Sequence, residues 1–411
     1  MRGRGRGVIV TIERLGHLGD AIGQGVFVSG ALPGERVEGE VHEGRIAAPR
    51  ILTPSPDRVR PPCPHARSCG GCLLQHASDG FVERWKQEVV RSALAGQGLE
   101  APFRPMAVSP PATRRRAVLS GRRTKGGALV GFHARQSGTI IPIPECKLLH
   151  PDLMQTIPAL ETLVRAAGSR SGELSLTVTR SLGGPDVAVT GGKALDAPLR
   201  AELARIAEER SLARLTWEGE TIALRVPPAQ AFGAARVVPP AGAFLQATAE
   251  GEAALLAAVR DAIGEARTVT DLFAGVGTFA LPLAAAAEVH AVEGDAAMTE
   301  ALDRGWRQAQ GLKRVTVETR DLFRRPLEPD ELRRAEAVVI DPPRAGAEAQ
   351  CAALARARVP VIAFVSCNPV TFARDAALLV RAGYRLDWVQ VVDQFRWSAH
   401  VELAARLSLP A

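Results

Sequence analysis

The pattern of hydrophobic and polar positions changes character along the chain. Residues 8–55 alternate apolar and polar positions and are broken by glycine-rich turns, as in VIVTIERLGHLGD. Short alternating strands with frequent turn signals are typical of small β-barrels. We therefore predict a small β-barrel over residues 1–55, of the size of an oligonucleotide-binding (OB-like) barrel. The Arg-Gly repeat in residues 1–6 is expected to be disordered.

The middle of the chain is harder to interpret. A proline-rich linker begins near Pro54, a helical pattern covers residues 81–95, and mixed strand patterns continue to about Pro240. These patterns predict a central α+β domain over residues 56–240, and they fix no particular fold.

Strand and helix patterns alternate regularly after residue 241. Buried strands are predicted at residues 269–273, 288–294, 314–321, 335–343 and 359–367, each followed by a helical pattern. This alternation predicts a doubly wound, mostly parallel sheet over residues 241–411, an α/β Rossmann-like domain. The last two strands, 384–393 and 400–409, are joined too tightly for a crossover and are expected to pair antiparallel.

Length and charge add to this picture. The chain has 411 residues, which favours two or three domains. Residues 1–150 hold 22 Lys and Arg against 12 Asp and Glu, whereas residues 151–411 hold 29 against 32. Basic runs such as 114–116 suit contact with a phosphate backbone, although a solvated basic face has the same pattern. The chain lacks an uncharged apolar run of about 18 residues, so we expect a cytoplasmic protein without membrane contact.

The first candidate site follows the strand at 269–273. The segment DLFAGVGTF, residues 271–279, contains Gly275 and Gly277, and the acids Glu293 and Asp321 end the next two strands. Glycines allow close backbone approach to a ligand, and an acid can accept hydrogen bonds from ribose hydroxyls. The segment therefore predicts a nucleotide-like cofactor, although a plain glycine-rich turn has similar residues.

The segment Asp341-Pro-Pro-Arg344 ends the fourth strand of this domain. Consecutive prolines fix a rigid turn that aims Asp341 into the mouth of the sheet. Methyltransferases that act on amino groups place an aromatic residue after such a turn. Arg344 instead favours a phosphate-bearing or otherwise polar substrate.

Cys367 and Glu402 are the candidate catalytic residues. Cys367 ends the strand at 359–367 and precedes Pro369, and Glu402 opens the last strand. Taken alone, Cys367 is equally compatible with a small core residue. At the mouth of the sheet beside Asp341, however, a thiol can act as a nucleophile. Glu402 can return to the same mouth as a base.

Together these residues fit methylation at carbon 5 of uracil. A thiolate that adds to carbon 6 makes carbon 5 nucleophilic toward a methyl sulfonium. A base then removes the carbon 5 proton, and the thiol is eliminated. Cys367 would be the nucleophile and Glu402 the base. A uracil stacked in RNA must flip out, or lie in a loop, to reach such a pocket.

A second cluster of chemistry lies in the central region. Cys63, Cys69 and Cys72 fall within ten residues, and Cys146 is the best candidate for a fourth ligand. This spacing is typical of a metal or iron–sulfur site in a reducing compartment. Zinc, with His65 or His76 as a ligand, is the competing interpretation.

These motifs resemble the S-adenosylmethionine-dependent RNA 5-methyluridine methyltransferases over nearly the whole chain. VFVSGALPGERV, residues 26–37, resembles their small RNA-binding barrel, called TRAM. The resemblance implies a class I methyltransferase domain, S-adenosyl-L-methionine as cofactor, and a [4Fe-4S] cluster rather than zinc on Cys63, Cys69, Cys72 and Cys146. It places the following residues in the cofactor pocket: Gln246, Phe273, Gly275, Gly277, Thr278, Glu293, Asp321 and Asp341. SCNPVT and HVE match the loop of the nucleophile Cys367 and the motif of the base Glu402.

The family pattern leaves alternatives open. Many members carry asparagine where this chain has Thr278, and asparagine is also common at the position of Asp321. We expect an rRNA substrate, 23S rRNA in particular, ahead of tRNA, and no protein partner is inferred. An RNA 5-methylcytosine methyltransferase is disfavoured, because it would carry cysteine where Arg344 stands. A non-catalytic RNA-binding protein would have no need to retain Cys367 and Glu402 together.

Overall fold

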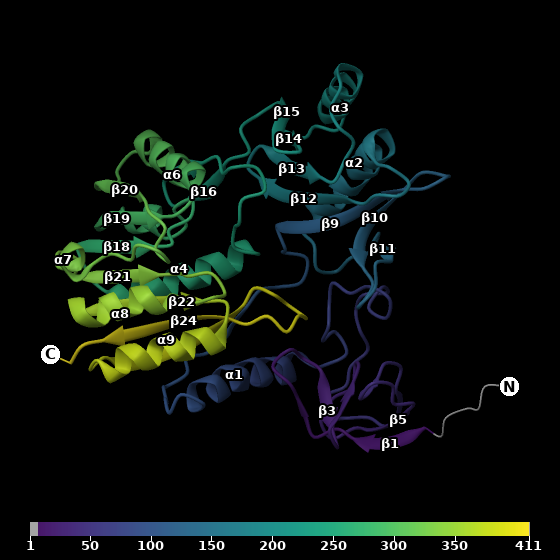
Figure 1. Cartoon of the computed structure of the whole chain (residues 1–411), viewed down its shortest axis with the longest axis horizontal. Coiled ribbons are helices and arrows are strands. Elements are labelled where there is room, and N and C mark those ends of the chain that lie inside the picture. The colour runs from purple at the N-terminus through teal and green to yellow at the C-terminus, as the bar shows by residue number, and fades with distance from the viewer. Residues whose placement is uncertain (1–6, 411) are drawn as a thin grey trace.

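The computed structural model describes residues 7–410, so the Arg-Gly repeat expected to be disordered lies outside the described residues. Figure 1 shows the N-terminal strands in purple, a central sheet in teal, and a C-terminal sheet in green and yellow that forms the largest layered unit. Within residues 7–410, none of the helices combines the length and apolar character that crossing a membrane requires.

The N-terminal region consists of short strands around one hydrophobic core. One sheet has the order β1-β5-β7, and the other has the order β2-β3-β4-β6. The strands are β1 (Val8–Thr11), β2 (Arg14–Leu15), β3 (Ala21–Gly23), β4 (Val26–Val28), β5 (Arg36–Gly39), β6 (Arg45–Ile46) and β7 (Arg50–Thr53). The short strands agree with the pattern of residues 8–55, and the RNA-binding barrel over residues 1–55 stays a prediction.

The central region is built on a seven-stranded sheet of order β11-β10-β9-β12-β13-β14-β15, which is antiparallel except between β13 and β14. Two helices pack with it into one core. The elements are β9 (Arg116–Arg123), β10 (Ala128–His133), β11 (Ile140–Pro142), α2 (Pro151–Ala167), β12 (Leu174–Ser181), β13 (Gly184–Thr190), α3 (Ala197–Glu209), β14 (Arg214–Trp217) and β15 (Glu220–Leu224).

The C-terminal sheet has the order β20-β19-β18-β21-β22-β24-β23-β8. The strands from β20 to β22 are parallel, and β24 runs antiparallel to both β22 and β23, as the short connection predicts. Its strands are β18 (Thr268–Leu272), β19 (Glu288–Glu293), β20 (Val315–Thr319), β21 (Ala337–Ile340), β22 (Val361–Ser366), β23 (Arg385–Asp393) and β24 (Glu402–Ser408). The chain order reverses between β18 and β21, where open α/β sheets bind ligands beyond the carboxyl ends of their strands.

Helices cover both faces of this sheet because alternate side chains of each strand point to opposite sides. Val339 and Ala363 belong to one core, and Val338 and Ile362 belong to the other. The first core includes α4 and α6, and the second includes α8 and α9. The helices are α4 (Ala249–Ile263), α5 (Ala280–Leu283), α6 (Ala296–Gln308), α7 (Pro329–Leu332), α8 (Glu348–Ala357) and α9 (Pro369–Arg381).

Segments from before residue 241 also pack into this body. The helix predicted over residues 81–95 is α1 (Asp79–Ala95), which packs into the same core as α9. β8 (Ala107–Val108) extends the sheet beside β23. The hairpin of β16 (Gln230–Phe232) and β17 (Ala235–Val237) contributes Phe232 and Val237 to the core that includes α6. The C-terminal sheet and its helices therefore pack with α1, β8 and the β16–β17 hairpin, all from before residue 241, and the division at residues 55 and 240 stays a prediction.

Candidate active site

A cavity of about 440 Å³ lies at the carboxyl ends of the C-terminal strands. It brings together nearly all the residues that the sequence placed in a cofactor pocket or in catalysis. These residues are Gln246, Phe273, Gly275, Thr278, Glu293, Asp321, Asp341, Cys367 and Glu402. Gly277 does not line the cavity. A side chain there would meet Leu281 and Leu302 at under 3.0 Å, so its role is close packing beneath the loop.

The loop after β18 turns sharply at the edge of this cavity. Phe273, Gly275 and Gly277 all have positive φ, at 61°, 56° and 93°. A positive φ suits glycine, and Phe273 is the exception. The Gly275 N–H donates to Glu293 Oε2 at 2.9 Å, and Glu293 Oε1 accepts from the N–H groups of Gly294 and Asp295. Glu293 is thus held at the end of β19 by three backbone donors.

Aromatic side chains stand beside these acids. The rings of Phe273 and Phe323 lie 5.5 Å apart in a tilted arrangement. Asp321 Oδ1 accepts from the Phe323 N–H at 3.0 Å. This hydrogen bond holds the exposed Phe323 near the end of β20. A planar, apolar group can stack against this pair of rings, and the carboxylates of Glu293 and Asp321 can accept hydrogen bonds from its polar substituents.

Glu402 is buried, 3% exposed, at the start of β24. Burial raises the pKa of Glu402 to about 8, and the charge of Asp341 adds to this rise, whereas the hydrogen bond from Gln394 and the charge of Arg344 oppose it. Burial likewise raises the pKa of Asp341, which is partly open to the cavity, to about 7. Crowded carboxyl groups of this kind are typical of sites that move protons.

Cys367 follows β22 and precedes α9, whose N-terminus is capped by the Asn368 side chain. Burial raises the pKa of the Cys367 thiol to about 11, with further contributions from Glu402 and Asp341, while Arg344 lowers it. The thiol is therefore protonated at neutral pH in this arrangement. A nucleophilic role requires that the proton leave when the site is filled.

Arg344 links the separate parts of the site. Its guanidinium lies 3.0 Å from Nδ1 of His400, two residues before Glu402. Its backbone carbonyl accepts from Asn368 Nδ2 at 2.9 Å and from Thr371 Oγ1 at 3.2 Å. These contacts connect the Asp341 turn to the helix after Cys367 and to the strand that begins at Glu402.

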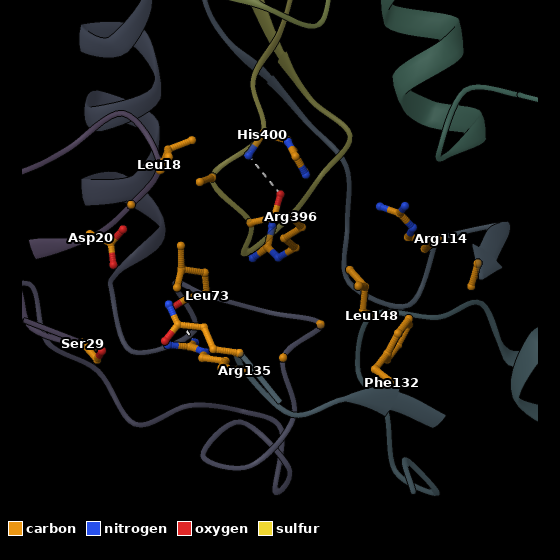
Figure 2. A pocket seen from close by; sticks show the side chains of 18 of the residues that line it. Leu18, Asp20, Ser29, Leu73, Arg114, Phe132, Arg135, Leu148, Arg396 and His400 are labelled. Atoms are coloured by element: carbon orange, nitrogen blue, oxygen red, sulfur yellow. Dashed lines mark hydrogen bonds between the residues drawn. The ribbon is translucent and has the colours of Figure 1, made fainter. Parts of the chain in front are cut away.

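A second cavity, which we call the interdomain groove, has a volume of about 650 Å³. Its walls come from turns of the N-terminal region and Arg45 of β6, the cysteine segment, β9 and β10, and the loop before Glu402. Figure 2 shows Arg114, Arg135, Arg396 and His400 around it. Arg45 and Arg396 pair with Asp20 and Asp79. His400 belongs to this groove and contacts Arg344 of the first cavity, so the two cavities adjoin.

The guanidinium groups of Arg116 and Arg135, two residues that line the groove, donate to backbone carbonyls. The partners are Ala243 and Gly242 for Arg116, and Cys72 and Leu73 for Arg135. Carbonyl partners orient a guanidinium without neutralising its charge. The groove therefore keeps a positive charge.

The four cysteines of the central region line one small cavity together with His65, whereas His76 does not line it. Backbone N–H groups point at two of the sulfur atoms, from Gly71 to Cys69 Sγ at 3.4 Å and from Leu148 to Cys146 Sγ at 3.5 Å. Burial raises the pKa of the Cys72 thiol to about 12. Among residues 7–410, however, no group of three or more His, Cys, Asp or Glu side chains has the arrangement of a metal site. The four cysteines lie around one cavity, and their role as ligands of a metal or iron–sulfur cluster stays a prediction.

Comparisons with known proteins decide the family. A family model described as tRNA (Uracil-5-)-methyltransferase matches residues 309–408. An uncharacterized RNA methyltransferase of Brucella suis biovar 1 is 45% identical over 404 residues, covering 97% of each chain. The 23S rRNA (uracil(1939)-C(5))-methyltransferase RlmD of Halomonas elongata is 36% identical over 453 residues, covering 98% of this chain and 89% of that one.

The chain belongs to the S-adenosylmethionine-dependent RNA 5-methyluridine methyltransferase family. The predicted activity, methyl transfer from S-adenosylmethionine to uracil carbon 5 in RNA, is thereby confirmed. The crystal structure of Pyrococcus abyssi tRNA (uracil-54, C5)-methyltransferase in complex with S-adenosyl-L-homocysteine superposes with a TM-score of 0.77 at 22% identity, covering 97% of this chain and 99% of that one. This likeness confirms the class I methyltransferase fold.

Some residues of this uridine methyltransferase site were missed by the sequence patterns. Phe244, Phe323 and Met298 line the first cavity, and Gln394 lies just behind it. Phe244 and Phe323 are 60% and 51% exposed, which is unusual for phenylalanine. Their exposure has no signal in the sequence, although Phe244 lies two residues before Gln246, which the family resemblance placed in the cofactor pocket. In the sequence, Gln394 differs from other glutamines only in that it follows a predicted strand, and it belongs to no motif that indicates a site.

Proposed function

We propose that this methyltransferase modifies a uridine of 23S rRNA through a covalent intermediate on Cys367, with Glu402 as the base. The observation that carries the proposal is that Cys367 and Glu402 line the same cavity as the predicted cofactor residues. The proposal for rRNA rests on the likeness to RlmD along nearly the whole chain. The tRNA enzyme of known structure shares 22% identity, which supports the fold alone.

In the proposed reaction, the Cys367 thiol first loses its proton to solvent, and the thiolate adds to uracil carbon 6. Carbon 5 then attacks the methyl carbon, whose bond to the sulfonium sulfur breaks, and S-adenosylhomocysteine leaves. Glu402 accepts the proton from carbon 5, and the bond between carbon 6 and sulfur breaks to return the thiolate. S-adenosylmethionine supplies the methyl group on a positively charged sulfonium. That charge favours the ionised forms of nearby acids, which suits a site whose resting groups are protonated.

The cofactor pocket is proposed from the cavity lining. Phe273 and Phe323 would stack on the adenine, and Glu293 would accept hydrogen bonds from the ribose hydroxyls. Gly275 would allow the closest backbone approach, because no atom lies within 4 Å of the place where its side chain would be. Gln246, Thr278, Asp321 and Asp341 complete the proposed pocket, and Gly277 supports it from beneath.

The test is methyl transfer from labelled S-adenosylmethionine to 23S rRNA and to tRNA, with the modified base identified by mass spectrometry. We expect 5-methyluridine in 23S rRNA. Cys367→Ala should abolish it, while Cys351→Ala, a matched change in the core beside α9, should leave it within about twofold. Methylation of tRNA alone would overturn the rRNA assignment, and an active Cys367→Ala variant would overturn the covalent route.

We also propose that RNA lies along the interdomain groove. The charges of Arg116 and Arg135 are oriented by carbonyls and remain free for phosphate, and the groove adjoins the cavity that contains Cys367. Arg116→Gln should weaken RNA binding and reduce the salt dependence by about one phosphate contact. Arg200→Gln, at an exposed pair with Glu220 outside the groove, is the control. Equal effects of the two changes would contradict this route.

The cysteine site is proposed to hold a [4Fe-4S] cluster. Its support is the Cys63, Cys69, Cys72 and Cys146 set around one cavity, with backbone N–H groups directed at sulfur. Protein purified without oxygen should be brown, absorb near about 400 nm, and contain iron and sulfide. Stoichiometric zinc without iron would replace the cluster with the competing zinc site. Absence of any metal would exclude both the iron–sulfur cluster and the zinc site.

A further inference from the structure

Gln394 is a buried amide directly behind the proposed catalytic base. It follows β23, is 1% exposed, and makes hydrogen bonds at both ends of its side chain. Its Oε1 accepts from the Ala247 N–H at 2.7 Å. Its Nε2 donates to Glu402 Oε2 at 3.0 Å and also to Gln246 Oε1. Both N–H groups and the carbonyl of the amide are therefore engaged.

The Ala247 N–H fixes which way this amide faces. A backbone N–H can only donate, so the oxygen of Gln394 must lie toward Ala247 and its nitrogen toward Glu402. Gln246 must then present its own oxygen to Gln394, which leaves its Nε2 directed at Asp341 Oδ2, 3.4 Å away. One backbone donor thus sets the polarity of a chain that runs from Glu402 through two glutamines to Asp341.

We propose that Gln394 is a positioning residue for methyl transfer, which holds Glu402 by Oε2 so that Oε1 is free to take the carbon 5 proton, and which orients the Gln246 amide. The inference rests on the proposed role of Glu402 as base. Among the described residues, Gln394 is the side-chain hydrogen-bond partner of Glu402. A carboxylate fixed on one oxygen presents the other in a single orientation, which is what proton transfer at a defined carbon requires.

The charged groups around Glu402 set the pH at which it ionises, and this pH can be measured. Asp341 after β21 and Cys367 after β22 face it as acids, and Arg344 faces it as the cation. The Gln394 hydrogen bond acts with Arg344 to lower the pKa of Glu402, against burial and Asp341. Loss of the donor therefore raises the pH at which Glu402 ionises, and a purely structural role would leave that pH unchanged.

Two variants separate these roles. Gln394→Met keeps the length of the side chain and removes its donors. Gln394→Glu keeps an acceptor for Ala247 and places a second carboxyl group beside Glu402. The control is Gln390→Met, a matched glutamine on β23 whose Nε2 bonds to the Pro105 carbonyl outside the cavity.

The experiment measures kcat and KM against pH on ordinary RNA, together with the fraction of enzyme in covalent adduct. For Gln394→Met we expect kcat near neutral pH to fall about 10- to 100-fold, and the covalent adduct to accumulate. The acid limb of the plot of kcat against pH should move upward by about one pH unit. Gln394→Glu should move this limb at least as far. KM for S-adenosylmethionine should rise by less than kcat falls, because Gln394 reaches the cofactor pocket only through the Gln246 amide. Gln390→Met should match the wild type.

A lower kcat with an unchanged acid limb and no adduct would overturn the inference and leave Gln394 a structural residue. Failure of the proposed function has a different signature. In that case Glu402→Gln would turn over normally, or wild-type enzyme would form no adduct on fluorinated RNA, whatever the Gln394 variants do.

Discussion

The backbone carbonyl of Trp397 accepts a hydrogen bond from the Leu73 N–H at 2.7 Å, and a second from the Leu74 N–H at 2.9 Å. Leu73 directly follows Cys72, and Trp397 lies in the loop that leads to Glu402. Trp397 also has a positive φ of 60°, which is uncommon for a large side chain and is held in place by its surroundings. The cysteine segment therefore supports the loop that positions the proposed base.

This pair of hydrogen bonds predicts that a substitution in the cysteine site also lowers the rate of methyl transfer. Cys72→Ser should lower the iron content of anaerobically purified enzyme and also reduce kcat, because the segment that holds the Trp397 carbonyl loosens. Binding of S-adenosylhomocysteine should change little, since no cysteine of this site lines the first cavity. Iron analysis, kinetics and calorimetric titration test this, with Cys351→Ala as the control. Iron loss with unchanged kcat would contradict the link.

A buried ion pair should stabilise the same loop. Lys86 of α1 has a fully buried side chain, and its Nζ lies 2.7 Å from Asp393 Oδ1. Lys86→Met leaves that carboxylate without its cation, so we expect a loss of about 3–5 kcal/mol in the free energy of unfolding. Denaturant unfolding measures it, and the double change Lys86→Met with Asp393→Asn should recover part of the loss.

The control for this pair is Arg84→Met on the same helix. Arg84 is exposed and pairs with Asp57 at 3.2 Å, so its loss should amount to roughly 0–1 kcal/mol. Similar losses for Lys86→Met and Arg84→Met would show that the buried pair contributes no more than a surface pair.

The carboxyl group of Glu402 should make stability depend on pH. Its pKa is raised from the ordinary 4.5 to about 8, so its contribution to stability is present at low pH and is lost as pH rises through about 8. Glu402→Gln has no such loss. The variant should melt above the wild type near pH 9, by about 2–4 °C for each kcal/mol relieved, and the difference should shrink toward pH 5. Calorimetry at several pH values tests this, and a constant difference would argue against the raised pKa.

The aromatic pair beside Glu293 should contribute to cofactor affinity. Phe323→Ala removes one ring of the pair and should weaken binding of S-adenosylhomocysteine about 5- to 10-fold, in line with about 1 kcal/mol for aromatic stacking. Leu182→Ala, a change at an exposed apolar residue outside this cavity, is the control. Unchanged binding in calorimetric titration of Phe323→Ala would exclude stacking against this ring.

The sequence predicts those site residues that lie at the ends of predicted strands. Asp341, Cys367 and Glu293 could be placed together because parallel strands bring their carboxyl ends to one edge, and burial confirms their strands as core elements. Gln394 could not be found this way. Its role depends on the Ala247 N–H, 147 residues earlier in the chain, and on which end of an amide faces it. The central sheet escaped prediction for a similar reason, because its strand order depends on long-range pairing that alternation does not encode.

The most direct test of the covalent route is to incubate the enzyme with S-adenosylmethionine and 5-fluorouridine-substituted 23S rRNA, and to map the product by mass spectrometry. Fluorine cannot leave carbon 5 as a proton, so the adduct should persist on a denaturing gel. We predict a heat-stable protein–RNA band that requires the cofactor, with the nucleotide attached to the peptide that contains Cys367. Attachment elsewhere, or no band from enzyme that binds the cofactor and methylates ordinary RNA, would contradict Cys367 as the nucleophile.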